Sequence, residues 1–579
     1  MIDISPLRAI FIGAAASVAA CLIDPAVPLA ATAFSGVAAG DMSANDAILW
    51  TRTVESATSQ PVASALTAQL ADKPEFRNVL FTYKGMTDSA RAGTVKIVAS
   101  GLKSHTRYFY RFVSDDGAVS PTGQFTTAPR DDEKVAIRFA FSGDAHGAWR
   151  PFPLVRGFGD LKLDYFVFLG DTMYESASQG SPPAVDPFVD PLQALADYRR
   201  KYLENIQPVK PGGFPGLQAM FAAQGNYTLL DNHELGNAQF QSGGAPPGNP
   251  PGAGVDAANP ANDVNASCDF INRTPGFSAL LQAYLNFQPV RERPVSAPGD
   301  CRSDGSWQLY SAQRWGANSI FINVDDRSYR DLQVTGTRAD NPARTMLGAT
   351  QLAWLQRTLL DAQKQGVTWK IVAISSPIDQ VGPFGPLFPW DGPKTWIGSY
   401  RAERTRLLKF IADNNINHVV FLTTDDHLNR VLELNYLADP TDPKSRRPVP
   451  GAFTVVAGPI GAVAPDKFTE HGFAAIKSVA DKLAADERAA GIEPIGLRPN
   501  FPGLKQVYRE GDPEADAIRQ PVDFYSPDTF NYATLEISAD GKSLAVDTWG
   551  INSYPPNSFP EPAEIAAPRR ILGFRIDAD

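Results

Sequence analysis

Four continuous apolar runs in the second part of the chain each end in a short polar cluster. Runs of this length, rich in β-branched and aromatic residues, are typical of strands buried on both faces of a sheet. The runs cover residues 136–141, 165–169, 227–230 and 419–422, and the clusters that follow them are 144–146, 170–174, 231–234 and 425–427. Because ligands of α/β sheets bind where the strands end, we expect the four clusters to meet at one edge.

Segments with helical periodicity alternate with these runs. In residues 351–364, Leu352, Leu355 and Leu359 recur at helical spacing, and the segment 401–414 has the same pattern. Each of the two segments precedes an apolar run. This alternation predicts a mixed or parallel sheet covered by helices, an α/β catalytic domain that we assign to residues 135–579.

A different pattern occupies residues 34–130. Short alternating runs separated by turns predict a small antiparallel β-sandwich of the immunoglobulin or fibronectin type. These runs are 47–50, 66–70, 79–83, 94–99, 108–113 and 122–126. A charged, proline-marked segment, 129–134, then forms the domain boundary. Within the catalytic domain, the Gly-, Pro- and Asn-rich stretch 235–304 predicts a long loop insertion, for which a lid and a plain surface insertion are both open.

The first 33 residues are typical of a signal peptide, with Arg8, an apolar stretch too short to span a bilayer, and small residues at 31–33. We expect export to the periplasm or outside the cell, with lipid anchoring through Cys21 as the alternative. Cleavage would leave Cys268 and Cys301, which are candidates for a disulfide or are two unrelated thiols.

Composition narrows the class of partner. A formal charge of −10 and a pI near 5.3 argue against nucleic acid as a main partner, because phosphate binding needs a basic footprint. A hydrophobic content of 43% with 20% charged residues is ordinary for a globular protein.

The four clusters carry the side chains of a hard-metal site. Carboxylate, imidazole and phenolate groups suit Fe, Mn, Zn or Ca. Such a centre would lower the pKa of bound water from 15.7 to about 7, which is worth on the order of 10 kcal/mol. The chain contains no Gly-x-Ser-x-Gly or Walker A pattern that would indicate another chemistry. An alternative for 231–234 is that its acids cap a helix.

The motifs, in their order, resemble those of the PhoD-type alkaline phosphatases within the calcineurin-like metallophosphoesterase superfamily. The motifs that carry the resemblance are 36–42, 48–52, 100–103 and 108–111 in the first domain, and 169–174, 230–234, 326–330, 351–355, 369–370, 390–391, 400–404 and 421–427 in the second. The resemblance implies a four-layer α/β/β/α metallophosphoesterase domain behind the N-terminal sandwich.

The resemblance also implies residue roles. It places the ligands of a di- or multinuclear metal centre at Asp144, Asp171, Tyr174, Asn232, Asp425 and His427. It makes His233 the residue that steadies the transition state or leaving group. Arg327 would contact phosphate, although a structural salt bridge is an equal alternative. The implied reaction is the attack of metal-bound hydroxide on a small-molecule or lipid phosphate mono- or diester.

Two departures from the family pattern fall in the first and last metal motifs. Many members have a cysteine ligand after the first strand, where this chain has Gly143 and Asp144 after Ser142, which favours an Asp144 and His146 ligand pair. Thr424 stands where glycine is usual. These departures leave open a catalytically silent binding protein on the same fold. A phospholipase D-like phosphodiesterase is open as a diesterase form of the enzyme, and a glycosidase is a weaker third, because Asp/Glu pairs alone are too common to support it.

Overall fold

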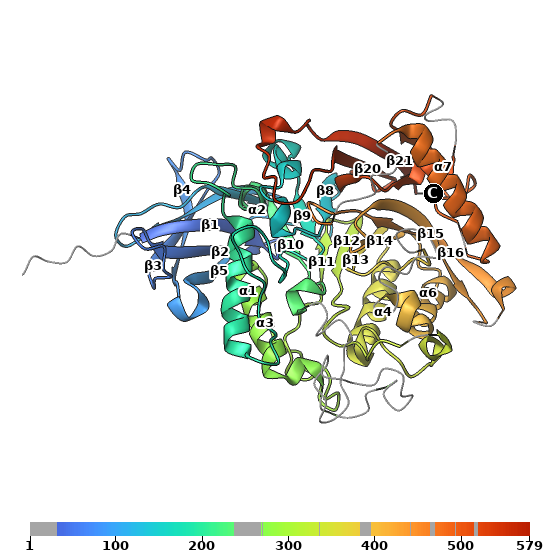
Figure 1. Ribbon diagram of the computed structural model, residues 1–579, viewed down its shortest axis with the longest axis horizontal. Coiled ribbons are helices and arrows are strands. Elements are labelled where there is room, and N and C mark those ends of the chain that lie inside the picture. The colour runs from blue at the N-terminus through green and yellow to red at the C-terminus, as the bar shows by residue number, and fades with distance from the viewer. Residues whose placement is uncertain are drawn as a thin grey trace, which may run out of the picture.

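Two large β-sheets lie face to face, and a small β-sandwich extends from them at the left of Figure 1. The computed structural model describes residues 32–236, 264, 268, 270–334, 336–381, 395–439, 442–463, 469, 471–492, 494–513 and 519–578. Helices pack on the outer face of each large sheet. The predicted fold class, an N-terminal sandwich followed by an α/β/β/α domain, is confirmed. Most of the predicted signal segment, including Cys21, lies outside the described residues.

The first large sheet has ten strands and carries three of the four polar clusters. In sheet order the strands are β17 (Leu504–Arg509), β21 (Arg569–Asp577), β20 (Ser543–Asn552), β19 (Thr529–Ile537), β8 (Ile137–Ser142), β9 (Tyr165–Phe168), β10 (Gly225–Thr228), β1 (Thr32–Gly40), β2 (Asp46–Glu55) and β5 (Thr94–Ser100). The strands β8, β9 and β10 are parallel neighbours. Their carboxyl ends therefore meet at one edge, as the apolar runs predicted.

The second large sheet carries the fourth cluster. Its strands, in order, are β11 (Ser311–Trp315), β12 (Ser319–Asn323), β13 (Trp369–Ala373), β14 (Val419–Thr423), β16 (Arg446–Val456), β15 (Asn429–Leu437) and β18 (Tyr525–Ser526). Four of them, β12, β13, β14 and β16, run parallel to one another. The two sheets bring the ends of β8, β9, β10 and β14 to the same region.

Successive side chains of the buried strands point to opposite faces of the sheet, so each strand contributes to two hydrophobic cores. In β8, Phe139 and Phe141 join the core between the two sheets, whereas Ala140 faces the helices outside the first sheet. The helices on that side are α1 (Pro191–Ile206), α2 (Leu217–Ala223) and α3 (Pro275–Phe287). Those outside the second sheet are α4 (Gly348–Lys364) and α6 (Arg401–Asp413), with α5 (Trp396–Ser399) beside them, and α7 (Phe473–Ala489) packs near β18. The predicted helices 351–364 and 401–414 thus correspond to α4 and α6.

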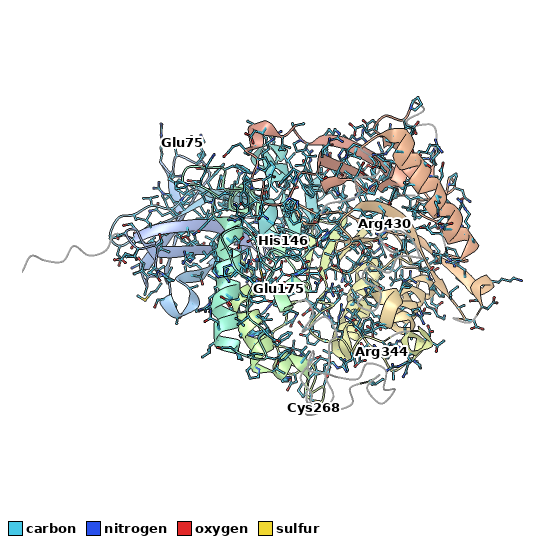
Figure 2. The ribbon with its side chains drawn as sticks, viewed as in Figure 1. Glu75, His146, Glu175, Cys268, Arg344 and Arg430 are labelled. Atoms are coloured by element: carbon cyan, nitrogen blue, oxygen red, sulfur yellow. A yellow bond between two sulfur atoms is a disulfide. The ribbon has the colours of Figure 1, made fainter. Side chains whose placement is uncertain are left out.

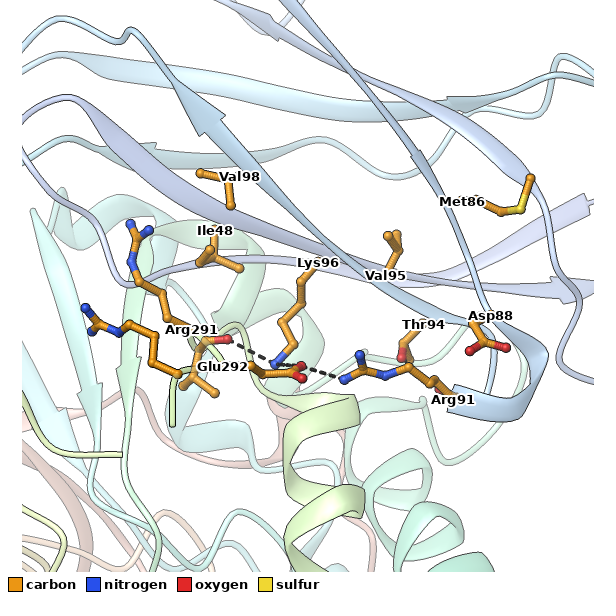
Figure 3. Close-up of a pocket in the computed structure, with 12 residues that line it drawn as sticks. Ile48, Met86, Asp88, Arg91, Thr94, Val95, Lys96, Val98, Arg291 and Glu292 are labelled. Carbon is orange, nitrogen blue, oxygen red and sulfur yellow. Dashed lines mark hydrogen bonds and ion pairs between the residues drawn. The ribbon is translucent and has the colours of Figure 1, made fainter. Parts of the chain in front are cut away.

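The N-terminal sandwich is continuous with the catalytic domain. Its second sheet contains β4 (Val79–Met86), β3 (Ala65–Ala71), β6 (Arg107–Ser114) and β7 (Gly123–Thr126). The facing strands β1, β2 and β5 belong to the ten-stranded sheet, because β1 pairs in parallel with β10. Glu292, which follows α3, also pairs with Arg91 at 2.5 Å and with Lys96 at 2.8 Å (Figure 3). The two domains therefore share a sheet and an ion-paired contact.

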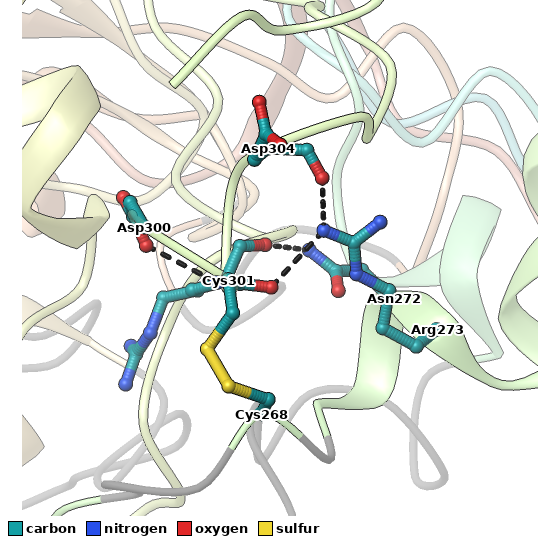
Figure 4. Close-up of a disulfide and its surroundings, with 7 residues drawn as sticks. Cys268, Asn272, Arg273, Asp300, Cys301 and Asp304 are labelled. Carbon is teal, nitrogen blue, oxygen red and sulfur yellow. Dashed lines mark hydrogen bonds between the residues drawn. A yellow bond between two sulfur atoms is a disulfide. The ribbon is translucent and has the colours of Figure 1, made fainter. Parts of the chain in front are cut away.

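The stretch 235–304 is not a loop throughout. Within its described part, α3 begins after the capping Thr274, with Pro275 at its first position, and buries Phe277, Leu280 and Tyr284. The prediction of a continuous loop is wrong for this segment, because the surrounding Gly- and Pro-rich composition masked a helical apolar pattern. After α3, Cys301 is joined to Cys268 by a disulfide with a Cα–Cα distance of 5.4 Å (Figure 4).

Candidate metal centre

Backbone hydrogen bonds hold the first two strand ends together. The amide of Asp144, after β8, donates to the carbonyl of Gly170, after β9, at 3.1 Å, and the amide of Ala145 donates to the carbonyl of Asp171 at 2.8 Å. A Cβ on Gly170 would lie 2.5 Å from the Cβ of Asp231, which follows β10. Only a glycine at position 170 allows the second and third clusters to approach this closely.

Four of the predicted ligands have a left-handed backbone. Asp144, Asp171, Asp425 and His427 have φ angles of 62°, 54°, 73° and 54°. This region is uncommon for residues other than glycine and costs free energy, so it persists only where the surrounding structure enforces it. Non-glycine residues in this conformation cluster at functional sites, and here they occupy three of the four strand ends.

Three carboxylates meet at the centre of the site. Asp144, Asp171 and Asp231 each offer one oxygen, and these oxygens all lie within 4.8 Å of one another. The three side chains are at most 1% exposed. Asp231 was not among the predicted ligands, although it belongs to the third cluster. The capping alternative accounts for its omission, and in the structure the helix there is a single 3₁₀ turn, His233–Leu235.

The electrostatics of the site favour a bound cation. Burial, reinforced by Asp231, Glu234 and other nearby carboxylates, raises the pKa of Asp171 well above its usual range. The Oδ1 atom of Asp144 is buried and accepts no hydrogen bond within the described residues. Crowded, buried oxygens of this kind match the ligand preference of hard metals. The residues present therefore fit the metal that the sequence predicts.

Arg327 contacts two of the acidic residues of the site and is 2% exposed. Its Nε donates to Asp231 Oδ1 at 2.5 Å and its Nη2 to Asp425 Oδ2 at 3.1 Å, while the Oδ1 of Asn232 lies 3.5 Å from Nη2. Ser375 donates to the same Asp231 oxygen at 2.7 Å. These contacts place Arg327 in a buried ion-pair network. They match the structural salt bridge that the sequence left open as the alternative to a phosphate contact.

Aromatic rings form the more exposed side of the site. The hydroxyl of Tyr174 lies 3.1 Å from His427 Nε2, and its ring centroid is 3.7 Å from that of His233 and 4.7 Å from that of His146. His233 Nδ1 lies 2.6 Å from Glu175 Oε2, which fixes the ring and leaves Nε2 directed elsewhere. His146 and Glu175 lie near the centre of the molecule in Figure 2.

The ring nitrogens of His146 both have protein partners. Nδ1 accepts from the amide of Ala148 at 2.9 Å, and Nε2 lies 2.8 Å from Ser176 Oγ. Because Nδ1 accepts, Nε2 carries the proton and donates to Ser176. The ligand role predicted for His146 would require this contact to break.

Two residues that sequence reasoning missed hold the strand ends in place. The buried carboxylate of Glu234 accepts the amides of Asp171 at 2.8 Å, Thr172 at 2.5 Å and Asp231 at 2.9 Å. From α1, the Asn205 amide donates to the carbonyls of Ala145 at 2.6 Å and Thr172 at 2.9 Å. Glu234 was visible as part of the third cluster, whereas no local signal marked Asn205.

Asp426, the middle residue of the fourth cluster, belongs to a buried ion-pair network. It pairs with the buried Arg430 at 2.5 Å, and Arg430 also pairs with Asp379 at 3.0 Å. The motif 390–391 lies outside the described residues. In the part of the chain that the structure describes, no helix is long and apolar enough to cross a membrane.

Comparison with known proteins gives consistent matches. A model of the PhoD-like phosphatase family matches residues 139–491, and a model of the PhoD-like phosphatase N-terminal domain matches residues 22–129. Alkaline phosphatase D of Bacillus subtilis (strain 168) is 26% identical over 435 residues, which span 71% of this chain and 67% of that protein.

A solved structure supports the fold. A structure of PhoD matches with a TM-score of 0.63 and 20% identity, over 94% of this chain and 90% of that one. Purple acid phosphatase PPD1 from yellow lupin (Lupinus luteus) seeds covers 95% of this chain and 75% of its own, with a TM-score of 0.47 and 12% identity. The fold assignment rests on the first structure and the family on the matching model, which covers more than half of the residues. The chain belongs to the PhoD-like phosphatase family.

Proposed function

We propose that this protein is an exported metal-dependent phosphoesterase that hydrolyses phosphate mono- or diesters, like the alkaline phosphatase D that it resembles. The observation that carries the proposal is the triad Asp144, Asp171 and Asp231, whose oxygens lie within 4.8 Å of one another at three parallel strand ends. When bound, a metal there would activate water and withdraw charge from the ester.

The proposed ligands are Asp144, Asp171, Tyr174, Asn232, Asp425 and His427, together with Asp231. Burial keeps bulk water from these oxygens and makes their attraction for a cation strong. Arg327 neutralises part of the negative charge and holds Asp231 and Asp425 in place. This keeps the carboxylates in position before any ester arrives.

We assign proton transfer to His233. Its Nδ1 is held by Glu175 at 2.6 Å, and Tyr174 packs against its ring. Its Nε2 lies 3.9 Å from Asp171 Oδ2, close to the proposed metal ligands. A histidine oriented by a carboxylate on one nitrogen is suited to give a proton to a leaving alkoxide through the other.

The test is an assay on p-nitrophenyl phosphate and bis-p-nitrophenyl phosphate, with and without chelator, combined with elemental analysis. We expect bound metal, hydrolysis that the chelator abolishes, and losses of at least 100-fold in Asp171→Asn and His233→Ala. Full activity of both variants, or a metal-free protein without turnover, would refute the proposal. The second result would favour the silent binding protein on this fold. The ratio of the two activities separates a monoesterase from a diesterase.

Export has its own test. The described strand β1 begins at Thr32, and Ala33 pairs with Val54 in the sheet, so cleavage after Ala33 would remove only the first two residues of the strand. Amino-terminal sequencing of protein secreted by an expressing bacterium should find a start near residue 34. A start at a lipid-modified Cys21 would support the anchored alternative, and an uncleaved chain retained inside the cell would refute export.

A further inference from the structure

Thr424 links the fourth strand end to the first proposed ligand. It directly follows β14, is fully buried, and its hydroxyl donates to Asp144 Oδ2. The other oxygen of Asp144, Oδ1, accepts no hydrogen bond within the described residues, and His427 Nε2 lies 3.6 Å from it. The two oxygens of one carboxylate therefore have different surroundings.

Packing fixes where the Thr424 side chain lies. A Cβ on Gly143 would lie 2.9 Å from both Cγ2 and Oγ1 of Thr424. A Cβ on Gly458 would lie 2.7 Å from Thr424 Oγ1 and 2.8 Å from Asp144 Oδ2. The Thr424 side chain thus fills a space bounded by two glycines, one of which, Gly143, follows β8 directly. Its hydroxyl has little freedom to turn away from Asp144.

We propose that Thr424 is a positioning residue that makes Asp144 a one-oxygen metal ligand, with Oδ2 held by the hydroxyl and Oδ1 directed at the metal. This inference rests on the metal centre of the proposed function. A hydroxyl-to-carboxylate hydrogen bond is charge-assisted and short, so it orients the carboxylate firmly. Residues that orient metal ligands in this way typically contribute 10–100-fold to metal affinity.

Removing the hydroxyl should change metal binding more than folding. Thr424→Val keeps the side-chain volume but removes the hydroxyl that donates to Asp144 Oδ2. The Asp144 carboxylate then no longer has a hydrogen bond that fixes its rotation. Thr424→Gly removes the hydroxyl and opens the space, and Thr424→Ser keeps the hydroxyl. The matched control is Thr423→Val, because the Thr423 hydroxyl is also buried but has no hydrogen-bond partner within the described residues.

The measurement is competition with EDTA for the metal that elemental analysis finds in the purified wild type, read as the chelator concentration that removes half of it. We expect Thr424→Val and Thr424→Gly to lose metal at about tenfold lower chelator, with Thr424→Ser and Thr423→Val within about twofold of wild type. The kcat on p-nitrophenyl phosphate should fall in the same order, and the unfolding midpoints of the metal-free variants measure separately what the lost hydrogen bond costs in stability.

Wild-type metal retention in Thr424→Val would overturn the inference, and so would equal losses in Thr424→Val and Thr424→Ser. If Thr424→Val does not fold, the contrast between Thr424→Gly and Thr424→Ser decides in the same way. A wild type that binds metal and hydrolyses ester, together with an unaffected Thr424→Val, refutes only the positioning role. A wild type that binds no metal refutes the proposed function and this inference with it.

Discussion

Glu234→Gln should destabilise the protein, although Glu234 is not a proposed ligand. Its carboxylate is fully buried and accepts four hydrogen bonds. Oε2 accepts from the amides of Asp171 at 2.8 Å and Asp231 at 2.9 Å, and Oε1 accepts from the amide and hydroxyl of Thr172 at 2.5 Å and 2.7 Å. A carboxylate with two acceptor oxygens fits this set of donors, and an amide does not.

Glutamine keeps one acceptor and turns the other into a donor. Whichever oxygen is replaced, two hydrogen bonds are lost: the NH₂ group then faces either the amides of Asp171 and Asp231 or the amide and hydroxyl of Thr172. Each unsatisfied buried donor costs about 1–3 kcal/mol, which gives about 2–6 kcal/mol for the pair. Burial raises the pKa of Glu234, so removing the charge relieves part of that cost. We therefore expect a loss of about 2–4 kcal/mol in the free energy of unfolding.

Glu487→Gln is the matched control. Burial raises the pKa of Glu487 to about 7, and its Oε2 accepts from the amide of Ile495 at 2.7 Å. The carbonyl oxygen of glutamine can accept that bond, so we expect a change below about 1 kcal/mol. Urea denaturation of the metal-free proteins gives both values. If Glu234→Gln lies within about 1 kcal/mol of wild type, the hydrogen bonds of Glu234 do not hold the strand ends.

Three further predictions concern other parts of the molecule. Cys301→Ser, which opens the 33-residue link to Cys268, should lower the free energy of unfolding in urea by about 3–4 kcal/mol. Burial lowers the pKa of Lys96 from 10.5 to about 8, so between these values the unfolded chain binds a proton that the native chain has lost. In this window the free energy of unfolding should therefore rise with pH. The slope should be steeper in wild type than in Lys96→Met by about 1.4 kcal/mol per pH unit, and equal slopes in the two proteins would contradict this. Glu175→Gln should slow hydrolysis of alkyl phosphates more than that of p-nitrophenyl phosphate, because the more basic alkyl leaving group depends more strongly on the proton from His233; an equal effect would exclude the orienting role.

The sequence predicts the local parts of this fold well, because burial on both faces leaves continuous apolar runs. Residues 165–169 and 419–422 match β9 and β14 within one residue, whereas β10 begins and ends two residues earlier than the run 227–230. Sequence periodicity did not predict the parallel pairing of β1 with β10, in which Ala39 lies opposite Gly225. That pairing joins segments almost 200 residues apart, and no local propensity encodes it.

The residues of the candidate site also fall into two groups, those that the sequence predicts and those that only the structure reveals. Polar residues that follow strands, such as Asp171, are visible as interruptions of an apolar pattern. Asn205 lies inside α1, where a polar residue normally faces solvent, yet it is 3% exposed and bridges two strand ends. Asp231 was hidden for a different reason: an acid before a helix has an ordinary explanation as a cap. Only the three-dimensional positions distinguish a cap from a member of the triad.

Repulsion within the triad gives a reason for the many hydrogen bonds that hold the surrounding strand ends together. Three buried carboxylates within 4.8 Å repel one another, and the single guanidinium of Arg327 offsets only part of that repulsion. Without rigid support, the cheapest response would be for the strand ends to move apart. Glu234, Asn205 and Thr424 tie those ends together from three different elements, so the repulsion is relieved by protonation or by a cation instead of by movement. A cation that binds only the folded chain then stabilises it in proportion to the logarithm of its concentration. We therefore expect metal binding and global stability to be coupled through the same few hydrogen bonds.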